Sequence, residues 1–451
     1  MHLHILGICG TLMGSIAQLA KEKGLTVSGT DENVYPPMST QLEQAGIEVR
    51  SPYTPENIPD DVDLVMIGNA NLPRGNPAVE HVLRERIPYI SGAEWLGRHL
   101  LTDKWVIAIS GTHGKTTTTS MTAWILEYAG LKPGYLVGGV PANFGQSARL
   151  GESPFFVIES DEYDTSYFDR RSKFVHYKPR TLVINNLEYD HADIFSDLAA
   201  IQSQFHLLLR TIPDNGQVIW PIDDKNVEAT LDQGCWSESQ PIGAGQLLEA
   251  NALRPDNSEF EVLLSGQKVG EVNWTMTGLH NQNNALAAIA AARHIGVTPQ
   301  ISCEALNNFQ GVKRRMEVIY ENPELCVYDD FAHHPTAIQS TLEGLRNKVG
   351  TENILAIIEP GSHTMRKGTH AQTLKNAAEI ADQVHWYQPE NILWDMREHI
   401  QGSKHQIEET HDALLDLTAQ TLEKNQFQHV VIMSNGGFGG FHQKLVSRLK
   451  T

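Results

Sequence analysis

The stretch that most constrains the fold of this chain is an apolar run that ends in a glycine-rich turn, WVIAISGTHGKTT at residues 105–117. Residues 105–109 have the character of a buried strand, and the run after the turn can be helical to about residue 130. A strand, a glycine loop and a helix start form a phosphate cradle, because loop N–H groups and the helix N-terminus favour anions. Lys115 would reach the terminal phosphates, and the Thr116 hydroxyl would bind Mg²⁺.

The loop departs from the general phosphate-binding pattern at one position, since Ile109 stands where that pattern has a first glycine. A bare Gly-x-x-Gly-Lys-Thr also arises by chance in a chain of 451 residues, and the alternative is a structural turn. We favour a nucleotide site because the loop stands between a strand and a helix.

The charge balance excludes one class of partner. The 35 basic and 54 acidic residues give a net charge of −19, which argues against a nucleic-acid surface. The four cysteines have no metal-binding spacing and fit reduced thiols. The N-terminus enters a strand directly and no apolar run reaches membrane-span length, so we expect no signal peptide, no membrane partner and a cytoplasmic protein.

The first segment has the layout of a dinucleotide fold, with a strand, a glycine turn and a helix to about residue 23. Its glycines are spaced G-x-x-G-x-x-x-G, so the NAD fingerprint fails. A second strand at 26–30 ends at Asp31, which can bind a ribose or sugar hydroxyl or simply cap the turn. The strand at 63–67 delivers residues 68–71 to the same sheet edge.

Carboxylates cluster at strand ends in the second segment. The strand at 154–158 leads to ESDEYD at 159–164, and a carboxylate at that point of such a sheet holds Mg²⁺ through oxygen. The strand at 181–185 ends in NLEYDHAD at 186–193. A lone His is usually structural, but His191 stands among carboxylates, so we favour a second metal contact. The helix at 278–290 begins with polar residues. Their side chains can bind the edge of adenine, and the alternative is that they only cap the helix.

In the third segment, strands at 325–328, 354–358, 384–387 and 429–433 alternate with helices, which predicts another doubly wound sheet. We therefore predict an α/β protein of three domains. These are a Rossmann-like domain at 1–101, a central P-loop ATPase-type parallel-sheet domain at 102–311, and a Rossmann-like doubly wound domain at 312–451.

A nucleotide site with two further ligand-binding sheets favours acyl-phosphate formation. A carboxylate attacks ATP in line, metal ions offset the charge, and an amine then displaces phosphate. Arg314 and Arg315 would add positive charge on the transferring group, and His333 and His334 are candidates for the proton acceptor on position alone. A simple NTPase switch would not need the two extra sheets.

Together these residues resemble the Mur ligase family, the ATP-dependent ligases of bacterial peptidoglycan synthesis, over essentially the whole chain. The motifs are the loop at 110–116, Glu159 with Glu162, residues 185–191, His280 and Asn281 with Asn284, Arg314 with Arg315, and residues 329–335. The loop of this family lacks the first glycine, which accounts for Ile109. The resemblance implies ATP as a substrate, two Mg²⁺ sites and no obligatory protein partner.

The resemblance also implies residue roles. The catalytic set is Lys115, Glu159, His191, Arg314, Arg315 and His333, and the metal ligands are Thr116, Glu159 and His191. The ATP contacts are Gly111, Thr112, His113, Gly114, Lys115, Thr116, Thr117, His280, Asn281, Asn284, Arg315 and Asp329. The UDP-sugar contacts are Gly10, Thr11, Met13, Asp31, Asn69, Ala70 and Asn71. The peptide contacts are His334, Ser362, Thr364, Met365, Arg366, Asn435, Gly437 and Phe438.

One metal ligand of the family has no counterpart. Several members carry a carbamylated lysine 15 residues after the metal-binding His, where this chain has His206. We expect other groups, such as Glu188 or Asp190, to complete the site.

Within the family, the N-terminal segment resembles the branch that accepts UDP-N-acetylmuramate itself. One member of that branch adds free L-alanine, and the other adds the recycled tripeptide L-alanyl-γ-D-glutamyl-meso-diaminopimelate. Stretches at 74–95, 359–365 and 434–444 favour the tripeptide, although Gly361 and His363 depart from the usual Arg-Ser-Asn-Thr-Met. The alternatives are the L-alanine ligase and a non-catalytic UDP-sugar and nucleotide-binding regulator.

Overall fold

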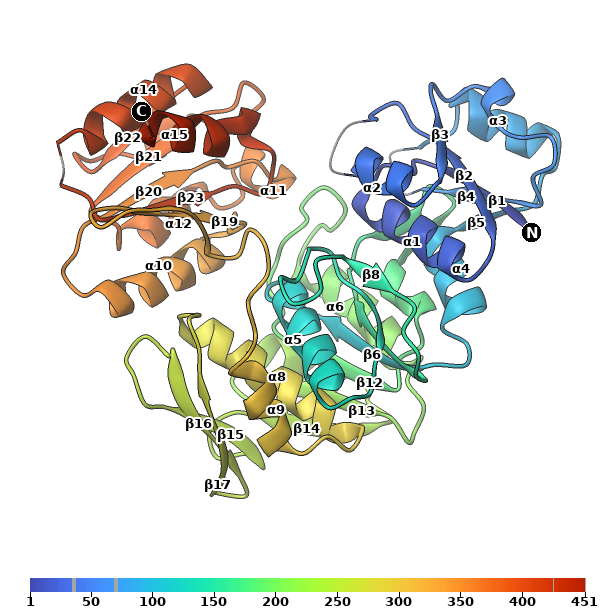
Figure 1. Ribbon diagram of the computed structural model, residues 1–451, viewed down its shortest axis with the longest axis horizontal. Helices are drawn as coiled ribbons and strands as arrows, with labels where there is room; N and C mark the ends of the chain where they lie inside the picture. Colours follow the sequence, from blue (N-terminus) through green and yellow to red (C-terminus); the bar gives the residue numbers. More distant parts are fainter. Residues whose placement is uncertain (35–37, 69–71, 425, 451) are drawn as a thin grey trace.

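The computed structural model describes residues 1–34, 38–68, 72–424 and 426–450. The described chain forms three successive α/β units, each with its own, largely parallel sheet (Figure 1). This architecture confirms the predicted fold class. Within the described residues, no helix combines the length and the apolar character that crossing a bilayer requires.

The first unit has a sheet of order β3-β2-β1-β4-β5 in which every pair is parallel. Its strands are β1 (His2–Leu6), β2 (Thr26–Thr30), β3 (Glu48–Arg50), β4 (Leu64–Ile67) and β5 (Tyr89–Ser91). Its helices are α1 (Thr11–Glu22), α2 (Met38–Gln44), the 3₁₀ turn η1 (Pro55–Asn57), α3 (Pro77–Arg84), α4 (Gly92–Trp95) and the π-helical turn η2 (Leu96–Leu100). The helix α3 begins at Pro77 because Asn76 before it caps two backbone N–H groups with its side chain and proline suits the first helical position.

The second unit has a sheet of order β14-β13-β12-β6-β9-β7-β8, parallel except for the pair β7–β8. Its strands are β6 (Trp105–Ser110), β7 (Gly134–Leu136), β8 (Ala148–Arg149), β9 (Phe155–Glu159), β12 (Thr181–Ile184), β13 (Gln217–Pro221) and β14 (Glu238–Ile242). Its helices are α5 (Lys115–Tyr128), η3 (Lys173–His176), α6 (Leu198–Leu209), α7 (Lys225–Leu231), α8 (Leu279–His294) and α9 (Pro299–Leu306). A hairpin of β10 (Asp164–Ser166) and β11 (Asp169–Ser172) and a small antiparallel sheet of β15 (Leu248–Ala252), β16 (Glu259–Leu264) and β17 (Gln267–Asn273) complete it.

The third unit has a sheet of order β18-β19-β23-β20-β21-β22, parallel except for the pair β18–β19. Its strands are β18 (Glu317–Glu321), β19 (Cys326–Asp330), β20 (Ile354–Ile358), β21 (Gln383–Tyr387), β22 (His405–Glu408) and β23 (His429–Met433). Its helices are α10 (Pro335–Val349), α11 (His363–Arg366), α12 (Ala371–Ala378), α13 (Met396–His399), α14 (His411–Leu422), η4 (Phe438–Gly440) and α15 (Phe441–Leu449).

The units are joined in two different ways. One continuous cluster of buried apolar side chains runs through the first and second units, from Leu3 in β1 to Leu231 in α7. The third unit has separate apolar clusters on the two faces of its own sheet. The linker that leads into it holds Arg314 and Met316 at positive φ, a conformation that costs energy for residues with a side chain. The first two units therefore form one packed body, while the third is attached through its linker, polar contacts and the packing of α10 against the start of α8.

Candidate active site

The predicted phosphate loop is present between β6 and α5. Gly111 and Gly114 both have positive φ, and a Cβ at Gly114 would lie 2.4 Å from Oδ1 of Asn284. Only glycine fits that second position, because the conformation and the close approach both exclude a side chain. The Oγ of Ser110 donates to the carbonyl of Val183 at 2.8 Å and ties the loop to β12. The loop is thus held on the sheet with the start of α5 open to the cavity described below.

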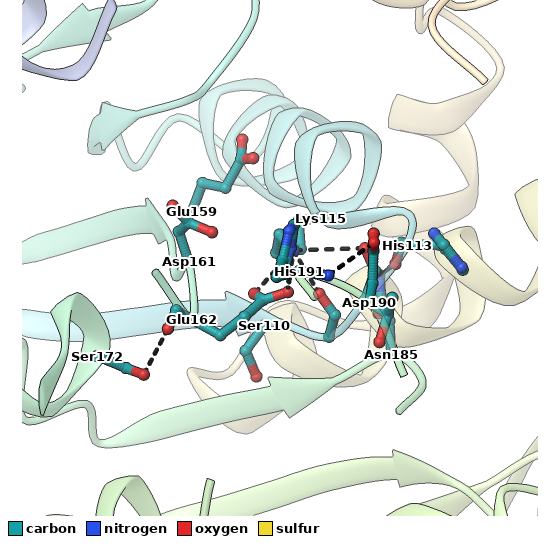
Figure 2. A network of polar contacts seen from close by, with 12 residues as sticks. Ser110, His113, Lys115, Glu159, Asp161, Glu162, Ser172, Asn185, Asp190 and His191 are labelled. Carbon is teal, nitrogen blue, oxygen red and sulfur yellow. Dashed lines mark hydrogen bonds and ion pairs between the residues drawn. The ribbon is translucent and has the colours of Figure 1, made fainter. Parts of the chain in front are cut away.

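Lys115 is the first residue of α5, and its ammonium group is held among oxygens. Its Nζ donates to the carbonyl of Gly111 at 2.6 Å and to Oε2 of Glu162 at 2.9 Å (Figure 2). Burial alone would lower the pKa of Lys115, but the charges of Glu162 and Asp161 outweigh burial and raise it. The lysine therefore stays a cation at neutral pH, as the binding of terminal phosphates requires.

Thr116 and Glu159 present oxygen atoms beside that lysine. The Thr116 hydroxyl donates to Oε1 of Glu159 at 3.0 Å, and the N–H of Gly138 donates to Oε2 of Glu159 at 2.7 Å. Burial raises the pKa of the Glu159 carboxyl, although the Gly138 bond and Lys115 act against that rise. A hydroxyl and a carboxylate are the hard oxygen ligands that Mg²⁺ prefers, so this pair fits that ion.

His191 lies beside a second carboxylate group. Its Nε2 is 2.9 Å from Oε1 of Glu162, and its backbone has a φ of +57°. One ligand atom from each of Asp161, Glu162 and His191 lies within 4.8 Å of the other two. Burial would lower the pKa of His191, but the hydrogen bond and charge of Glu162 raise it. The loops after β9 and β12 bring these groups together because both strands flank β6.

Glu188 and Asp190, the groups expected to complete the metal site, also have other partners. Asp190 accepts from the Thr364 hydroxyl at 2.7 Å, and Oε2 of Glu188 lies 3.3 Å from Nε2 of His113. His206 lies in α6 with its ring centroid 5.8 Å from that of Trp236. Glu162 and Asp161 also lie beside His191 (Figure 2).

The third unit contacts this centre through α11. The Thr364 hydroxyl donates to Asp190, and the N–H of Ala192 donates to the same hydroxyl oxygen at 3.2 Å. The Nζ of Lys367 donates to the carbonyl of Ala192 at 2.7 Å. Thr364 is only 2% exposed, so its side chain is used in this contact between units. From Thr364, polar contacts run without a break through Asp190, His191 and Glu162 to the lysine of the phosphate loop.

The two arginines of the linker have different surroundings. The Nη2 of Arg315 is 3.4 Å from Oγ1 of Thr116, and its guanidinium lies 4.6 Å from the centre of the Phe331 ring. The Nη2 of Arg314 instead donates to the carbonyls of Ser434 at 2.7 Å and Gly436 at 2.9 Å. Arg315 therefore faces the phosphate loop, whereas Arg314 holds the turn after β23.

One large cavity of about 1860 Å³ lies where the three units meet. The predicted site residues that line it are Thr11, Thr112, His113, Gly114, Lys115, Thr116, Thr117, Glu159, His191, His280, Asn281, Asn284, Arg314, Arg315, Asp329, His333, Asn435 and Gly437. The structure thus gathers residues more than 300 positions apart, from Thr11 to Asn435, around one space.

Other predicted site residues do not face this cavity. Met13, Met365 and Phe438 are packed in apolar clusters, because each lies on the inner face of its helix or turn. Asp31 accepts from the N–H of Cys9 at 2.8 Å and from the Tyr53 hydroxyl at 3.1 Å, so its carboxylate braces the first glycine turn.

The remaining predicted residues have mainly local roles. Gly10 precedes α1, Gly111 gives its carbonyl to Lys115, and the hydroxyl of Ser362 caps α11. Arg366 ends α11, and His334 is buried at the start of α10. Asn69, Ala70 and Asn71 lie outside the described residues.

Three further residues belong to this centre although no role was assigned to them from the sequence. Glu162 holds both Lys115 and His191, and Lys173 Nζ pairs with Asp161 at 2.8 Å. The acidic run at 159–164 indicated where the carboxylates of the site lie. It did not indicate which carboxylate contacts Lys115. That choice depends on the path of the turn after β9.

Three family models match the chain in sequence order. They are described as "Mur ligase family, catalytic domain" over residues 2–104, "Mur ligase middle domain" over 109–292, and "Mur ligase, glutamate ligase domain" over 314–436. The chain belongs to the Mur ligase family. As a member of it, the protein is an ATP-dependent ligase.

Individual Mur ligases cover the whole chain. It is 52% identical to the UDP-N-acetylmuramate–L-alanyl-γ-D-glutamyl-meso-2,6-diaminoheptandioate ligase of Escherichia coli strain K12, over 100% of this chain and 98% of that one. The crystal structure of a murein peptide ligase from Psychrobacter arcticus is similar with a TM-score of 0.76 and 44% identity, over 100% and 98% of the two chains. A UDP-N-acetylmuramate–L-alanine ligase from Salinibacter ruber is 33% identical over 79% of this chain and 74% of that one.

Proposed function

We propose that this Mur ligase joins the tripeptide L-alanyl-γ-D-glutamyl-meso-diaminopimelate to the lactyl carboxylate of UDP-N-acetylmuramate, with release of ADP and phosphate. The observation that carries the proposal is the 52% identity, over the whole chain, to an E. coli ligase named for these two substrates. The similarity to an L-alanine ligase is lower and spans less of the chain, which favours the tripeptide. We further propose a cytoplasmic enzyme of the peptidoglycan recycling route that needs no protein partner.

The proposed division of labour follows the three units. UDP-N-acetylmuramate binds to residues 1–101 at the edge that carries Thr11, ATP binds to 102–311, and the tripeptide binds to 312–451. Two Mg²⁺ ions would be held by oxygens of Thr116 and Glu159 and by the group around His191. When bound, they offset the negative charge of the phosphates during transfer. The cavity touches all three units, which supports one shared reaction space.

The side chains of the site would act in two successive steps of the reaction. Lys115 and Arg315 place positive charge at the phosphate loop, where the lactyl carboxylate attacks the γ-phosphate to form an acyl phosphate. The amine of the tripeptide displaces phosphate from that intermediate and must lose a proton. His333 lines the cavity and is the candidate for that proton; burial lowers its pKa to about 4, which leaves its ring neutral at pH 7 but also makes it a weaker base.

The test of this function is a comparison of two amino substrates. The purified protein is incubated with ATP, Mg²⁺ and UDP-N-acetylmuramate and with either the tripeptide or free L-alanine, and phosphate release and product mass are measured. We expect kcat/KM to be higher with the tripeptide. Faster turnover with alanine would identify the L-alanine ligase, and no turnover with either would support a non-catalytic binding protein.

Thr364 gives a prediction about the contact between units. Thr364→Val removes the hydroxyl that donates to Asp190, and a hydrogen bond to a charged group contributes about 1.5–3 kcal/mol. We therefore expect kcat to fall about tenfold, with little change in the affinity for UDP-N-acetylmuramate. Thr364→Ser is the matched control, since it keeps the hydroxyl and should keep most of kcat. Equal rates for the Val and Ser variants would show that the contact does not position the loop of His191.

A further inference from the structure

A second group of potential metal ligands lies apart from the proposed Mg²⁺ positions. It consists of His113 in the phosphate loop, Glu188 after β12 and His334 before α10, and one ligand atom of each lies within 4.8 Å of the other two. The cluster joins the second unit to the third, because His334 is the N-cap residue of α10. None of the roles proposed above requires these three side chains to meet.

The separations within the cluster suit a metal ion better than hydrogen bonds. Nε2 of His113 is 3.3 Å from Oε2 of Glu188, and Nδ1 of His334 is 3.6 Å from the same oxygen. Good N–H···O bonds have a separation of about 2.7–3.2 Å. A tetrahedral zinc site with bonds of about 2.0–2.2 Å has ligand–ligand separations of about 3.3–3.6 Å. Both measured separations fall at these values.

The buried imidazole of His334 makes few hydrogen bonds. The side chain is 6% exposed, and its Nε2 has no hydrogen-bond partner in the part of the chain that the structure describes. Its Nδ1 accepts only a long bond of 3.3 Å from the N–H of Thr336. A third imidazole, that of His370, lies with its ring centroid 4.4 Å from that of His334, and its Nε2 is likewise buried without a partner among the described residues. Buried polar atoms usually have partners, so both imidazoles are incompletely satisfied, and an ion at Nδ1 of His334 would displace only the long bond from Thr336.

The residues around the cluster orient Glu188, leave the site open to the large cavity, and keep the ligands in the protonation state that binds a metal ion. The Thr336 hydroxyl donates to Oε2 of Glu188 at 2.8 Å, the kind of outer bond that orients a metal-binding carboxylate. His113 and Glu188 both line the large cavity, so an ion can enter from it. Burial acts to raise the pKa of Glu188, but the bond to His113 and other contacts lower it to about 2, and burial lowers the pKa of His334 to about 3. Neither ligand has to lose a proton at neutral pH.

We propose that His113, Glu188 and His334 bind a divalent transition-metal ion of the Zn²⁺ type, at a site distinct from the Mg²⁺ positions. Two imidazoles and a carboxylate are ligands of zinc rather than of Mg²⁺, which takes oxygen. A bound ion would fasten the phosphate loop to the third unit. His113 and Glu188 line the cavity beside the phosphate loop, so an ion held there would obstruct the proposed nucleotide site and inhibit turnover.

The direct test uses Co²⁺ as a probe for the zinc position, with the full-length protein and no substrate. Four-coordinate Co²⁺ absorbs visible light far more strongly than six-coordinate Co²⁺, so the spectrum reports the geometry of the site. We expect one equivalent to bind with the strong spectrum, and His334→Gln and Glu188→Gln each to weaken binding by at least about tenfold. His99→Gln, which removes an exposed histidine of η2, is the control and should bind like the wild type.

Two outcomes would overturn the site. They are a six-coordinate spectrum only, or equal binding by the wild type and both variants. X-ray absorption of the zinc-loaded wild type counts its imidazole ligands and does not depend on any variant folding. In a phosphate-release assay with saturating Mg²⁺, Zn²⁺ should inhibit the wild type more strongly than His334→Gln. The cobalt spectrum requires no turnover, so its result is separate from that of the tripeptide assay.

Discussion

Lys115→Ala is expected to lower kcat by about 10³-fold or more, because cationic groups on a transferring phosphoryl group contribute about that much in related chemistry. The Nζ of Lys115 is the cation that the structure places between the phosphate loop and Glu162. Thr11 and the rest of the first-unit edge lie on a different sheet, so binding of UDP-N-acetylmuramate should be largely intact. Phosphate release gives kcat, and calorimetry with the UDP-sugar gives the affinity.

The control for Lys115→Ala tests whether its effect arises from the unpaired charge of Glu162 rather than from the loss of the lysine itself. Removal of Lys115 deprives buried Glu162 of its strongest counter-charge, and an unpaired buried charge destabilises a fold. The double variant Lys115→Met with Glu162→Gln removes both charges and should unfold at a temperature closer to that of the wild type. If the double variant regains turnover, the lysine acts only in stability. If Lys115→Ala loses UDP-sugar affinity as strongly as turnover, the two sites do not lie on separate units.

The regular elements of the fold could be predicted from the sequence because their signals are local. The apolar runs at 354–358 and 429–433 are strands with those bounds, and the helix after the phosphate loop ends at Tyr128, close to the predicted residue 130. Short edge elements such as β8 and β22 have little apolar pattern and were not predicted. Their pairing is set by neighbouring strands, which a local pattern cannot report.

The site was predictable as a set of strand ends but not as a set of contacts. Parallel strands bring their carboxyl ends to one edge, and this places Lys115, Glu159 and His191 around one cavity. The pattern could not show that Glu162 pairs with both Lys115 and His191, or that Thr364 serves a contact between units. These details depend on turn paths and on the packing of the third unit, both of which are tertiary properties.

Glu159→Gln is the second variant with a large expected effect. Gln keeps the size of the side chain and an oxygen that can accept from Gly138 N–H, but it loses the negative charge that a hard cation prefers. We expect kcat to fall about 10²-fold and the Mg²⁺ concentration for half-maximal rate to rise, since electrostatic groups at a reacting centre contribute about 10²–10³-fold. Phosphate release is measured across a Mg²⁺ titration.

The matched control for Glu159 is Glu152→Gln, which neutralises an exposed carboxylate that pairs with Lys132 on the surface. Exposed pairs contribute little, so that variant should keep the rate and the Mg²⁺ dependence of the wild type. A Glu159→Gln enzyme with normal Mg²⁺ dependence would mean that the carboxylate only fastens Gly138 and Thr116. Partial recovery of rate at high Mg²⁺, with unchanged KM for UDP-N-acetylmuramate, would instead place the cation between Glu159 and the phosphates, because weaker binding is then offset by mass action.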